Sequence, residues 1–584
     1  MPAPNTWAST ATQAYPVATL SNATSLGALP ASTSMHIVVG LQEQNPDQVQ
    51  PTLRAMLTPG NALYGTSLTV QQFVTQFGAT SAQVQAVEDY LTSAGFTNVT
   101  AAPNQLLVEA DGTAGIVETA FNVSLAQYSV NGATVYANTS PAQVPQSLSG
   151  TVLAVLGLNN IVHYHTDLTN GSSSPPSKAT DPCTPPVCNT PAQPLADTAF
   201  GPADYQIAYD AACPSDNAKC PAEKFPPASC VTIGSIAEGE ISQTITDLAN
   251  YETAFDLPKV PVTAVYAGIA SPDTSGQVEW DLDSQSSTGI AQNVEHYYFY
   301  VATSLTDSDL GLAINKWATD DKARLLSISI GECEFFPYLD GAMVLDDEMF
   351  GEAALQGQTA FASSDDNGSA CPSEAPNGVP LGGPPDTSYP ASSPYVIASG
   401  GTQLFTNADY TYDFEVGWYA GGGGPSYFET SPFWQSYTGS GTAPIVVSSE
   451  AGQRGVPDVA MCADPNICGA YIFSGGPAGA GSNESNGSYC CYGGTSLASP
   501  LSMGAWARIE AAHDIKTGKY LGFAGPLIYQ LANGAPTLNS PYFNDVTLGA
   551  NGAYSAGLGY DYVTGLGSWD IYEINKVIPS TYPQ

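Results

Sequence analysis

The sequence predicts an α/β protein, with a parallel sheet flanked by helices and a smaller α+β unit in front of it. Between residues 205 and 584, short apolar strands alternate with helices, which is typical of a parallel sheet covered by helices. Between residues 35 and 165, strands and helices alternate in a shorter pattern, which indicates an α+β sandwich. A proline- and serine-rich segment, residues 166–204, separates the two parts and is typical of a linker.

The N-terminal part begins with residues 1–34, which are rich in Ala, Thr, Ser and Pro and which we expect to form a loosely held lead-in. The α+β unit follows from Met35. Apolar residues recur at helical spacing in the stretch 81–94, and Gly95 ends that helix. The expected elements are a strand at 36–41, helices at 47–56 and 81–94, a strand at 106–110, a helix at 113–121 and a hairpin at 123–128 and 134–137.

The linker contains a run rich in serine and proline that continues to Pro194. It is either a plain connector or a cleavable junction, because exposed segments of this composition are common sites of proteolytic nicking. We therefore expect a maturation site within residues 166–204.

The C-terminal part has buried-type strands whose carboxyl ends should carry a site, as in other open α/β sheets. The acidic run 363–368 follows one such end. The glycine-rich loop 421–424 either offers backbone groups to an extended ligand or forms a flexible surface turn. The expected strands are 231–236, 262–266, 296–303, 325–330 and 359–362, and the expected helices are 241–255, 310–319 and 343–355, with a helix or ordered turn near 279–283.

The charge balance is unusual, with 13 Lys+Arg against 53 Asp+Glu, a formal net charge of −40 and only 11% charged residues. The surface is either simply acidic and soluble or adapted to acid, because few bases repel one another once the carboxylates are protonated. Nothing resembles a basic patch, which excludes nucleic acid as an expected partner. No apolar run reaches the length of a membrane span, so we expect no membrane association.

Eleven cysteines occur from Cys183 onward and none before it. None fits a zinc pattern with histidine partners, so we expect disulfides and a secreted, extracellular protein. The N-terminus lacks the features of a secretory signal, so either a signal has been removed or export uses another route. Because the number of cysteines is odd, at least one is unpaired within the expected monomer. The pairs that lie close in sequence are Cys183/Cys188, Cys213/Cys220, Cys462/Cys468 and Cys490/Cys491.

Ser496 lies where the glycine turn Gly493-Gly494 meets an apolar run that is compatible with a helix. The glycines allow a substrate backbone to approach closely, and free N–H groups at a helix start can face a developing oxyanion. The pattern indicates a nucleophile, although an ordinary N-cap serine would look the same.

A serine nucleophile needs a base, and the histidines do not supply an evident one. Three of them, His36, His163 and His165, fall in the N-terminal unit or at its edge. His513 follows the expected helix after Ser496, where we expect a surface or C-terminal capping residue. The usual imidazole base is therefore expected to be missing.

Glu279 and Asp283 offer carboxylates instead. They are spaced i, i+4, so both would share one face of a helix. Two carboxylates that close tend to share a proton and could deprotonate a serine at about pH 3–5, where a histidine is already protonated. The alternative is a solvated acidic helix start, favoured by the helix dipole.

These motifs together resemble the sedolisins, or serine-carboxyl peptidases, a family of acid peptidases with a subtilisin-like fold. In chain order, the motifs are Glu-Trp-x-Leu-Asp at 279–283, Ser-x-Asp-x-Gly at 364–368 and Gly-Thr-Ser-x-x-x-Pro at 494–500. Further similar stretches lie at 399–402, 418–424, 432–435 and 454–459, and two in the N-terminal unit at 65–69 and 90–96. The resemblance covers nearly the whole chain. It implies a subtilisin-like catalytic domain over residues 205–584, preceded by a ferredoxin-like activation prodomain over residues 35–165, as in the kumamolisin- and sedolisin-like members.

The resemblance also implies roles for four residues. Ser496 would be the nucleophile and Glu279 the general base. Asp283 would orient Glu279 and help to hold its proton. Asp366 would donate a hydrogen bond in the oxyanion hole, for which it must be protonated. The family usually has glycine before this aspartate, whereas this chain has Asp365, which could alter the titration of Asp366 or compete for its role.

A second group of oxygen donors lies near the C-terminus. Asp545-Val546 and the run from Gly557 through Gly559 to Asp561 combine two carboxylates with backbone carbonyls at glycine turns. Hard oxygen donors of this kind suit Ca²⁺, and the region resembles the calcium site of the same family. One structural Ca²⁺ is expected, and the alternative is a plain turn-rich loop.

We therefore expect a secreted, acid-active serine-type endopeptidase that is made as a self-processing zymogen. Its substrates would be proteins and peptides, and its own prodomain would be an intramolecular inhibitor. A histidine-dependent subtilisin relative is disfavoured because no His-Gly-Thr motif is present. A catalytically inactive homologue is disfavoured because all four site positions carry competent side chains. A secreted calcium-binding or cell-surface protein would not explain the ordered motifs.

Overall fold

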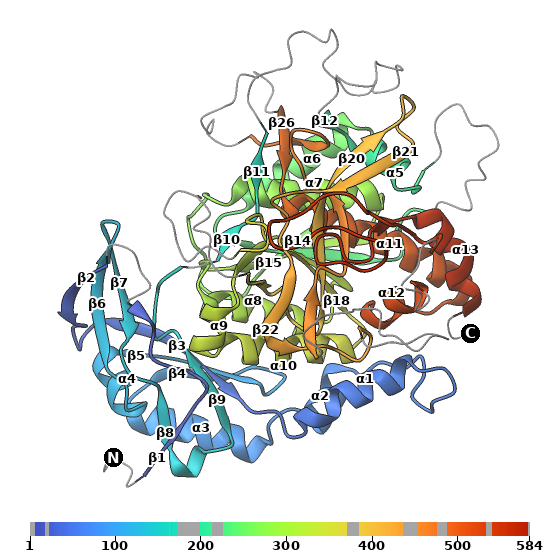
Figure 1. Ribbon diagram of the computed structural model, residues 1–584. Coiled ribbons are helices and arrows are strands. Elements are labelled where there is room, and N and C mark those ends of the chain that lie inside the picture. Colours follow the sequence, from blue (N-terminus) through green and yellow to red (C-terminus); the bar gives the residue numbers. More distant parts are fainter. Residues whose placement is uncertain are drawn as a thin grey trace.

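The computed structural model describes most of the chain (Figure 1). The described ranges are 6–17, 23–162, 164–171, 199–212, 226–370, 385–435, 452–475, 488–532 and 540–581. Most of the predicted linker lies outside these ranges, together with His163, Cys183, Cys188, Cys213 and Cys220.

An eight-stranded sheet forms the centre of the C-terminal part. All neighbouring strands in it are parallel except the β20–β21 pair, which is antiparallel. Its inner strands are buried almost throughout, as expected for a sheet covered on both faces. The predicted α/β fold is confirmed. The strands follow the order β14 (Val262–Tyr266), β15 (His296–Ala302), β13 (Thr232–Glu238), β16 (Leu325–Ile328), β18 (Thr359–Ser363), β20 (Val396–Thr406) and β21 (Tyr412–Gly417), and β24 (Val459–Cys462) also pairs with β20.

Two groups of helices pack against this sheet (Figure 1). The first group is α6 (Ser242–Ala254), α7 (Gln277–Ala291) and α11 (Thr495–Thr517); the second is α8 (Asp307–Asp320) and α10 (Ala342–Leu355). Helix α7 packs against α11, and α11 in turn contacts β16, β18, β20 and β24. Because α7 and α11 are in direct contact, side chains on their facing sides are brought together.

The N-terminal unit is an α+β sandwich with its own apolar core. Helix α3 shows how local sequence determines an element, because Thr80 and Gln83 form a capping box and Gly95 ends the helix at φ 103°. The antiparallel sheet has the order β4 (Thr97–Ala101), β5 (Leu107–Thr113), β3 (Ser34–Leu41) and β9 (Val152–Leu156), accompanied by α3 (Ser81–Ala94), α4 (Ala114–Ala120) and the hairpin of β6 (Leu125–Val130) and β7 (Ala133–Asn138).

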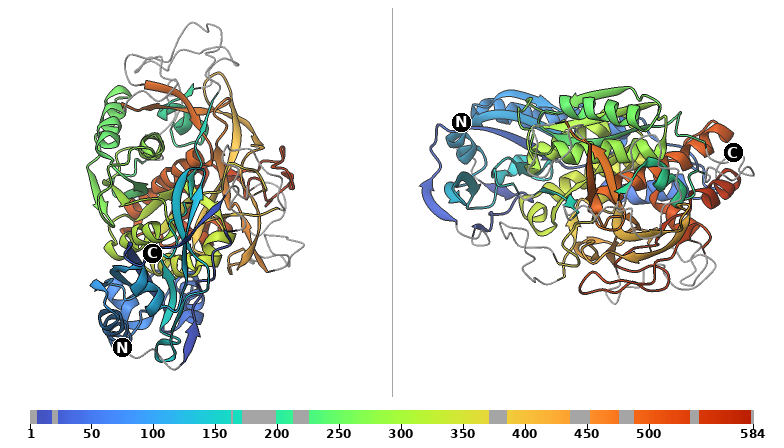
Figure 2. Two further views of the ribbon diagram at one scale, coloured as in Figure 1. Left: turned by 90° about the vertical axis from the view of Figure 1, so that its left-hand side faces the viewer. Right: turned by 90° about the horizontal axis from the view of Figure 1, so that it is seen from above.

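This unit packs against the α8–α10 side of the larger part (Figures 1 and 2). Helices α1 (Val49–Leu57) and α2 (Val70–Gln76) lie along α10. Asn104 in the N-terminal unit donates hydrogen bonds to Asn315 at 2.6 Å and to Glu352 at 2.7 Å. Polar side chains of the two parts therefore form hydrogen bonds with each other across the contact.

Several N-terminal elements differ from the sequence prediction. The lead-in is not loosely held throughout, because β1 (Trp7–Ser9) pairs with β8 (Gln143–Pro145) and β2 (Thr24–Ala28) pairs with β6. Helix α2 and strands β4 and β9 were not predicted either. Pairing with distant segments determines the conformation of these strands, whereas α2 begins at a capping box formed by Thr69 and Gln72.

The remaining elements of the described chain are mostly short. They are the 3₁₀ turns η2 (Pro46–Gln48) and η3 (Gln146–Leu148), β12 (Ala199–Phe200), α5 (Pro202–Ala208), α9 (Phe335–Asp340), β19 (Ser388–Tyr389), β22 (Gly424–Thr430), β23 (Gln453–Val456), β25 (Gly469–Phe473), α12 (Gly525–Leu531), β27 (Phe543–Asn544), β28 (Ser568–Trp569) and α13 (Ile571–Thr581).

The described cysteines are mainly oxidised. Cys462 and Cys468, which lie close in sequence, form a disulfide with an S–S distance of 2.07 Å. Cys333 and Cys491 are also disulfide-bonded, and Cys230 is a free thiol. In the described part of the chain, every helix is too short or too polar to cross a bilayer.

A fully buried ion pair joins Arg454 to Asp458. The guanidinium binds both carboxylate oxygens, at 2.8 Å from Oδ1 and 2.5 Å from Oδ2, and both side chains are 0% exposed. Asp458 also accepts hydrogen bonds from the Ala398 backbone N–H at 2.8 Å and from the Tyr529 hydroxyl at 2.7 Å. The pair thus ties β23 to β20 and to α12.

We predict that Arg454→Met lowers the stability of the folded protein by about 3–5 kcal/mol, because it leaves Asp458 buried without its counter-charge. Thermal unfolding at neutral pH measures the change. Lys322→Met is the control, because Lys322 pairs with Asp320 at the surface at 3.1 Å and such pairs contribute little. Equal, small shifts for both variants would contradict the prediction.

Candidate active site

Ser496 lies at the start of α11, directly after a glycine turn. Gly494 adopts φ +93°, a conformation that other residues rarely take. A Cβ on Gly494 would lie 2.0 Å from the Asp167 carbonyl oxygen, so only glycine allows this backbone contact. The Ser496 side chain is buried, and its Oγ donates a hydrogen bond to the Ser329 carbonyl oxygen at 3.2 Å.

Glu279 and Asp283 lie one turn apart on α7, which packs against α11. They are 1% and 0% exposed, so the alternative of a solvated acidic helix start is wrong. Ser329 connects the pair to the serine, because its Oγ donates to Asp283 Oδ1 at 2.5 Å while its carbonyl accepts from Ser496. The Glu279 carboxylate makes no hydrogen bond to any described residue.

Burial dominates the electrostatics of these two carboxyls. It raises the pKa of Glu279 well above its ordinary value, the charge of Asp283 raises it further, and the nearby Ser496 hydroxyl lowers it. Burial also raises the pKa of Asp283, opposed by the Ser329 hydrogen bond. Two carboxyls in such a position titrate as one unit, because ionising both would place two charges in a low dielectric.

Asp366 reaches the residue next to Ser496. Its Oδ1 accepts hydrogen bonds from the Thr495 backbone N–H at 2.7 Å and from the Thr495 hydroxyl at 3.0 Å. Its Oδ2 accepts from the Thr169 hydroxyl at 2.7 Å. Burial raises the pKa of Asp366 to about 7, although these hydrogen bonds oppose the shift. Asp366 therefore holds a proton below neutral pH.

Asp365 plays a different part in the same loop. Its φ of +90° lies in the left-handed region, where glycine is favoured and Asp is tolerated. Its Oδ1 accepts a hydrogen bond from the Asn367 amide at 2.6 Å. The side chain points toward His165, whereas Asp366 faces Thr495. The two adjacent carboxyls thus have separate surroundings.

The glycine-rich loop 421–424 packs against the acidic loop that carries Asp365. The Gly422 N–H donates to the Asp365 carbonyl at 2.7 Å, and the Ser364 hydroxyl donates to the Gly422 carbonyl at 2.8 Å. A Cβ on Gly422 would lie 1.6 Å from the Ser364 carbonyl oxygen. The alternative of a flexible surface turn is wrong, because these glycines are buried in close backbone contacts.

A segment from the end of the N-terminal unit crosses the site. Strand β10 (His165–Thr166) pairs antiparallel with β17 (Ile330–Cys333), and β11 (Thr169–Asn170) pairs antiparallel with β26 (Ser488–Gly493). Asp167 lies between them. Its carbonyl oxygen accepts a hydrogen bond from the Ser496 backbone N–H at 3.1 Å.

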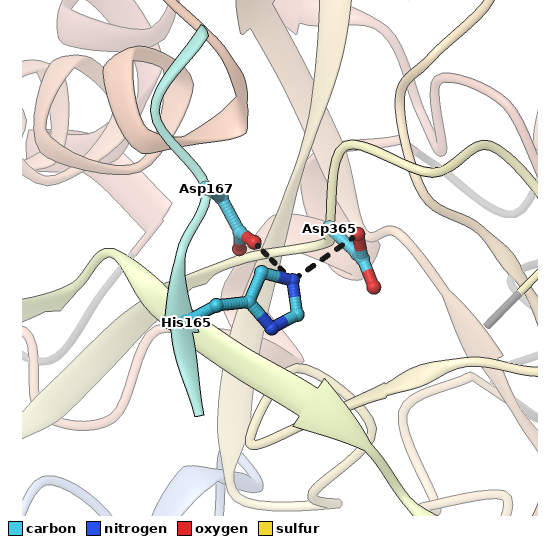
Figure 3. A group of neighbouring side chains, drawn as sticks. All are labelled: His165, Asp167 and Asp365. Atoms are coloured by element: carbon cyan, nitrogen blue, oxygen red, sulfur yellow. Dashed lines mark ion pairs between the residues drawn. The ribbon is translucent and has the colours of Figure 1, made fainter. Parts of the chain in front are cut away.

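The Asp167 side chain is buried in a pocket formed by its neighbours Ser363, at the end of β18, His165 and Asp365. Its Oδ2 accepts a hydrogen bond from the Ser363 hydroxyl at 2.5 Å. Figure 3 shows His165 between Asp167 and Asp365, with its Nε2 3.4 Å from an Asp167 oxygen and 3.8 Å from an Asp365 oxygen. Burial, followed by the charge of Asp365, raises the pKa of Asp167.

The other described histidines lie away from Ser496. His513 was expected at the surface beyond the helix, but it lies inside α11 and is 0% exposed. Its Nδ1 is 3.0 Å from the Lys519 carbonyl, and burial lowers its pKa to about 4. His36 lies 2.8 Å from Asp111 in the N-terminal unit, and the hydrogen bond with Glu109 raises its pKa to about 9.

The proposed calcium residues are close together in the structure. The Gly559 N–H donates to both carboxylate oxygens of Asp545, at 3.2 and 3.1 Å. Asp561 accepts from the Gly557 N–H at 2.8 Å, and the Thr564 hydroxyl lies 3.4 Å from the Val546 carbonyl. The hydrogen bonds therefore tie both carboxylates to one glycine-containing loop, and carboxylate and backbone carbonyl oxygens are ligands that suit Ca²⁺.

Sequence reasoning missed Ser329, Asp167 and Thr495. Ser329 offered a signal, because it follows an apolar strand whose carboxyl end faces the site. It also breaks the predicted strand 325–330 into β16 and β17. Asp167 offered none, because it stands in a segment that was assigned to the linker.

Comparisons with known proteins agree with the resemblance. The family model described as "Pro-kumamolisin, activation domain" matches residues 21–161. The chain is 37% identical over 606 residues to sedolisin of Pseudomonas sp. (strain 101), covering 99% of this chain and 93% of that protein. It is 36% identical to xanthomonalisin of Xanthomonas sp. (strain T-22), covering 94% of this chain and 66% of the relative.

A solved structure agrees as well. It is Pseudomonas sedolisin, a serine-carboxyl proteinase complexed with two molecules of pseudo-iodotyrostatin, and it is 34% identical with a TM-score of 0.55. The match covers 66% of this chain and 98% of that one. The identity across almost the whole of the first relative, together with the matching activation domain, shows that this chain belongs to the sedolisin family of serine-carboxyl peptidases.

Proposed function

We propose that this peptidase is a secreted, acid-active endopeptidase made as a self-processing zymogen, with Ser496, Glu279, Asp283 and Asp366 as its catalytic set. The main support is the contact between α7 and α11, which brings a buried carboxyl pair to a serine at a helix N-terminus. Proteins and peptides are the proposed substrates. The Cys462–Cys468 disulfide supports secretion.

In the proposed reaction, Ser496 Oγ attacks the carbonyl carbon of the scissile bond and its proton passes to the ionised Glu279. Asp283 holds the shared proton of the pair, which leaves Glu279 free to act as the base. The oxyanion receives hydrogen bonds from the Ser496 N–H and from protonated Asp366. Glu279 then returns its proton to the leaving amine, and water hydrolyses the acyl-enzyme by the same steps.

The direction of the pH dependence follows from Asp366. Below its pKa of about 7, the carboxyl is neutral and can donate a hydrogen bond to the oxyanion. As the pH rises through that value, it ionises, loses the donor and repels the oxyanion. Activity should therefore be lost on the neutral side.

The N-terminal unit would inhibit the enzyme before processing. Its trailing segment lies between β17 and β26 and buries Asp167 beside Ser496. A substrate could not occupy the same strand positions at the same time. Cleavage of that connection in acid would open the site.

We predict that acidification converts the purified full-length chain to a product of about two-thirds its length, as expected for nicking at a proline- and serine-rich linker. Its new N-terminus should lie within residues 166–204, which intact-mass measurement can assign. Ser496→Ala should remain full length under the same conditions. If this variant is processed at the wild-type rate, the chain does not cleave itself.

We predict that Asp366→Ala lowers kcat about 10²–10³-fold, as removal of other oxyanion donors does. Asp366→Asn keeps a donor that needs no proton, so it should retain activity and extend it to higher pH. Cleavage of denatured haemoglobin or casein from acid to mildly alkaline pH measures both effects. Wild-type cleavage at neutral pH instead would favour a histidine-dependent mechanism, and no cleavage at any pH would favour an inactive homologue.

Asp365→Gly serves as a matched variant in the same loop. Glycine accepts the φ of +90° without strain, so kcat in acid should stay near the wild-type value. The charge of Asp365 raises the pKa of Asp366, so its removal should move the loss of activity to slightly lower pH. If Asp365→Ala loses most of the activity and Asp366→Ala loses little, the oxyanion role belongs to Asp365.

We also propose one structural Ca²⁺ held by Asp545, Asp561 and the carbonyls of Val546, Gly557 and Gly559. Ca²⁺ bound there would neutralise two neighbouring carboxylates and fix the C-terminal loop.

Because this Ca²⁺ would bind the folded state, we predict that chelation at neutral pH lowers the Tm of the Ser496→Ala protein and that added Ca²⁺ restores it. Asp561→Ala should lose this response. The same Tm with and without chelator would exclude the ion.

A further inference from the structure

We propose that the Asp167–Leu168 peptide bond is the bond that Ser496 cleaves first, so that the processed chain begins at Leu168. This inference rests on the proposed self-processing and adds the scissile bond and the pocket that selects it. It goes beyond the presence of a linker, because it depends on the alignment of one peptide group with Ser496.

The backbone on the N-terminal side of this bond is bound as an added strand. His165 is paired with Gly331 and Thr166 with Ile330 in the antiparallel β10–β17 ladder. The Asp167 N–H then donates to the Ser329 carbonyl at 3.3 Å. These contacts hold the chain in an extended conformation up to the residue that supplies the carbonyl.

The Asp167 carbonyl lies where an oxyanion would form. Its oxygen accepts a hydrogen bond from the Ser496 N–H at 3.1 Å. A Cβ on Gly494 would lie 2.0 Å from this oxygen and 2.4 Å from Asp366 Oδ2. The carbonyl oxygen therefore lies beside both proposed oxyanion donors, and the nucleophile belongs to the same residue as the first of them.

The chain on the C-terminal side is also held as a strand. Thr169 is paired with Gly493, and its hydroxyl donates to Asp366 at 2.7 Å. The Gly171 N–H donates to the Cys491 carbonyl at 2.9 Å. The extended segment thus continues on both sides of the Asp167–Leu168 bond, with Ser496 at the junction.

The side chain of Asp167 determines which peptide bond is aligned with Ser496. It is 0% exposed and lies in the pocket with Ser363, His165 and Asp365. The Ser363 hydroxyl donates to its carboxyl, and the Asp365 carboxyl nearby disfavours a second negative charge. The pocket suits a small neutral acid or amide side chain.

The cleavage step needs no reactant besides water. Ser496 Oγ forms an ester with the Asp167 carbonyl carbon, and its proton passes to Glu279. The C–N bond to Leu168 breaks as that nitrogen accepts the proton. Water then hydrolyses the ester, leaving a carboxyl group on Asp167 and a free amine on Leu168.

The test is a time course of the full-length protein after a shift to acid, with both fragments identified by intact mass. The earliest products should end at Asp167 and begin at Leu168. Because the bond already lies at Ser496, the first-order rate should be the same over a hundredfold range of protein concentration. Earliest fragments with other ends, or a rate that rises in proportion to concentration, would overturn the proposal.

Leu168→Pro should prevent this cut, because it replaces the scissile N–H with a ring, and processing should slow at least about tenfold. Leu168→Ala is the matched control and should stay within about threefold of the wild-type rate. A near-UV circular dichroism spectrum and a Tm that match those of the Ser496→Ala protein would show that both Leu168 variants fold. Processing of a folded Leu168→Pro variant at the wild-type rate would contradict the assignment.

The outcome also separates this inference from the proposed function. Release of peptides from casein with a first cut elsewhere would refute the Asp167–Leu168 assignment and leave the peptidase assignment intact. If neither casein nor the chain itself is cleaved at any pH, the proposed function fails and this inference fails with it.

Discussion

Burial of carboxyl groups between α7 and α11 is the constraint on which the site depends. Glu279 and Asp283 have almost no exposure to water, so ionising them requires a charge in a low dielectric. The same packing places them beside Ser496, at the N-terminus of α11. The chemistry of the proposed reaction, with its shared proton, is therefore a consequence of the helix packing.

The same constraint extends beyond these two residues. Burial raises the pKa of Glu332, Asp340 and Asp346 as well. A group whose pKa is higher in the folded than in the unfolded chain stabilises the fold at low pH, and this stabilisation is lost as the pH rises through the folded-state value. The chain has 13 basic residues against 53 acidic ones. At low pH it can thus keep its buried carboxyl groups protonated and neutral, without a basic partner for each of them.

One strand-like segment links the two parts of the molecule in function. Residues 165–170 extend the sheets on both sides of Ser496, so the contacts that would exclude an external substrate are the contacts that would align a bond for cleavage. Inhibition and self-processing can therefore share one geometry. The buried Asp167 side chain makes that geometry specific to one register, because a shift by one residue would turn a different side chain into the pocket.

The sequence by itself determined the elements and the residues whose signals are local. Alternating apolar strands and helices predicted the α/β sheet, Gly95 predicted a helix end, and the i, i+4 spacing of Glu279 and Asp283 predicted a shared helix face. The glycine turn before Ser496 likewise follows from residues that are adjacent in the chain. Only the tertiary structure decided how buried these groups are, that Ser329 joins Asp283 to Ser496, and that His513 lies inside a helix. It also decided that Asp167 reaches the site, because strand pairing between segments far apart in sequence leaves no local pattern to read.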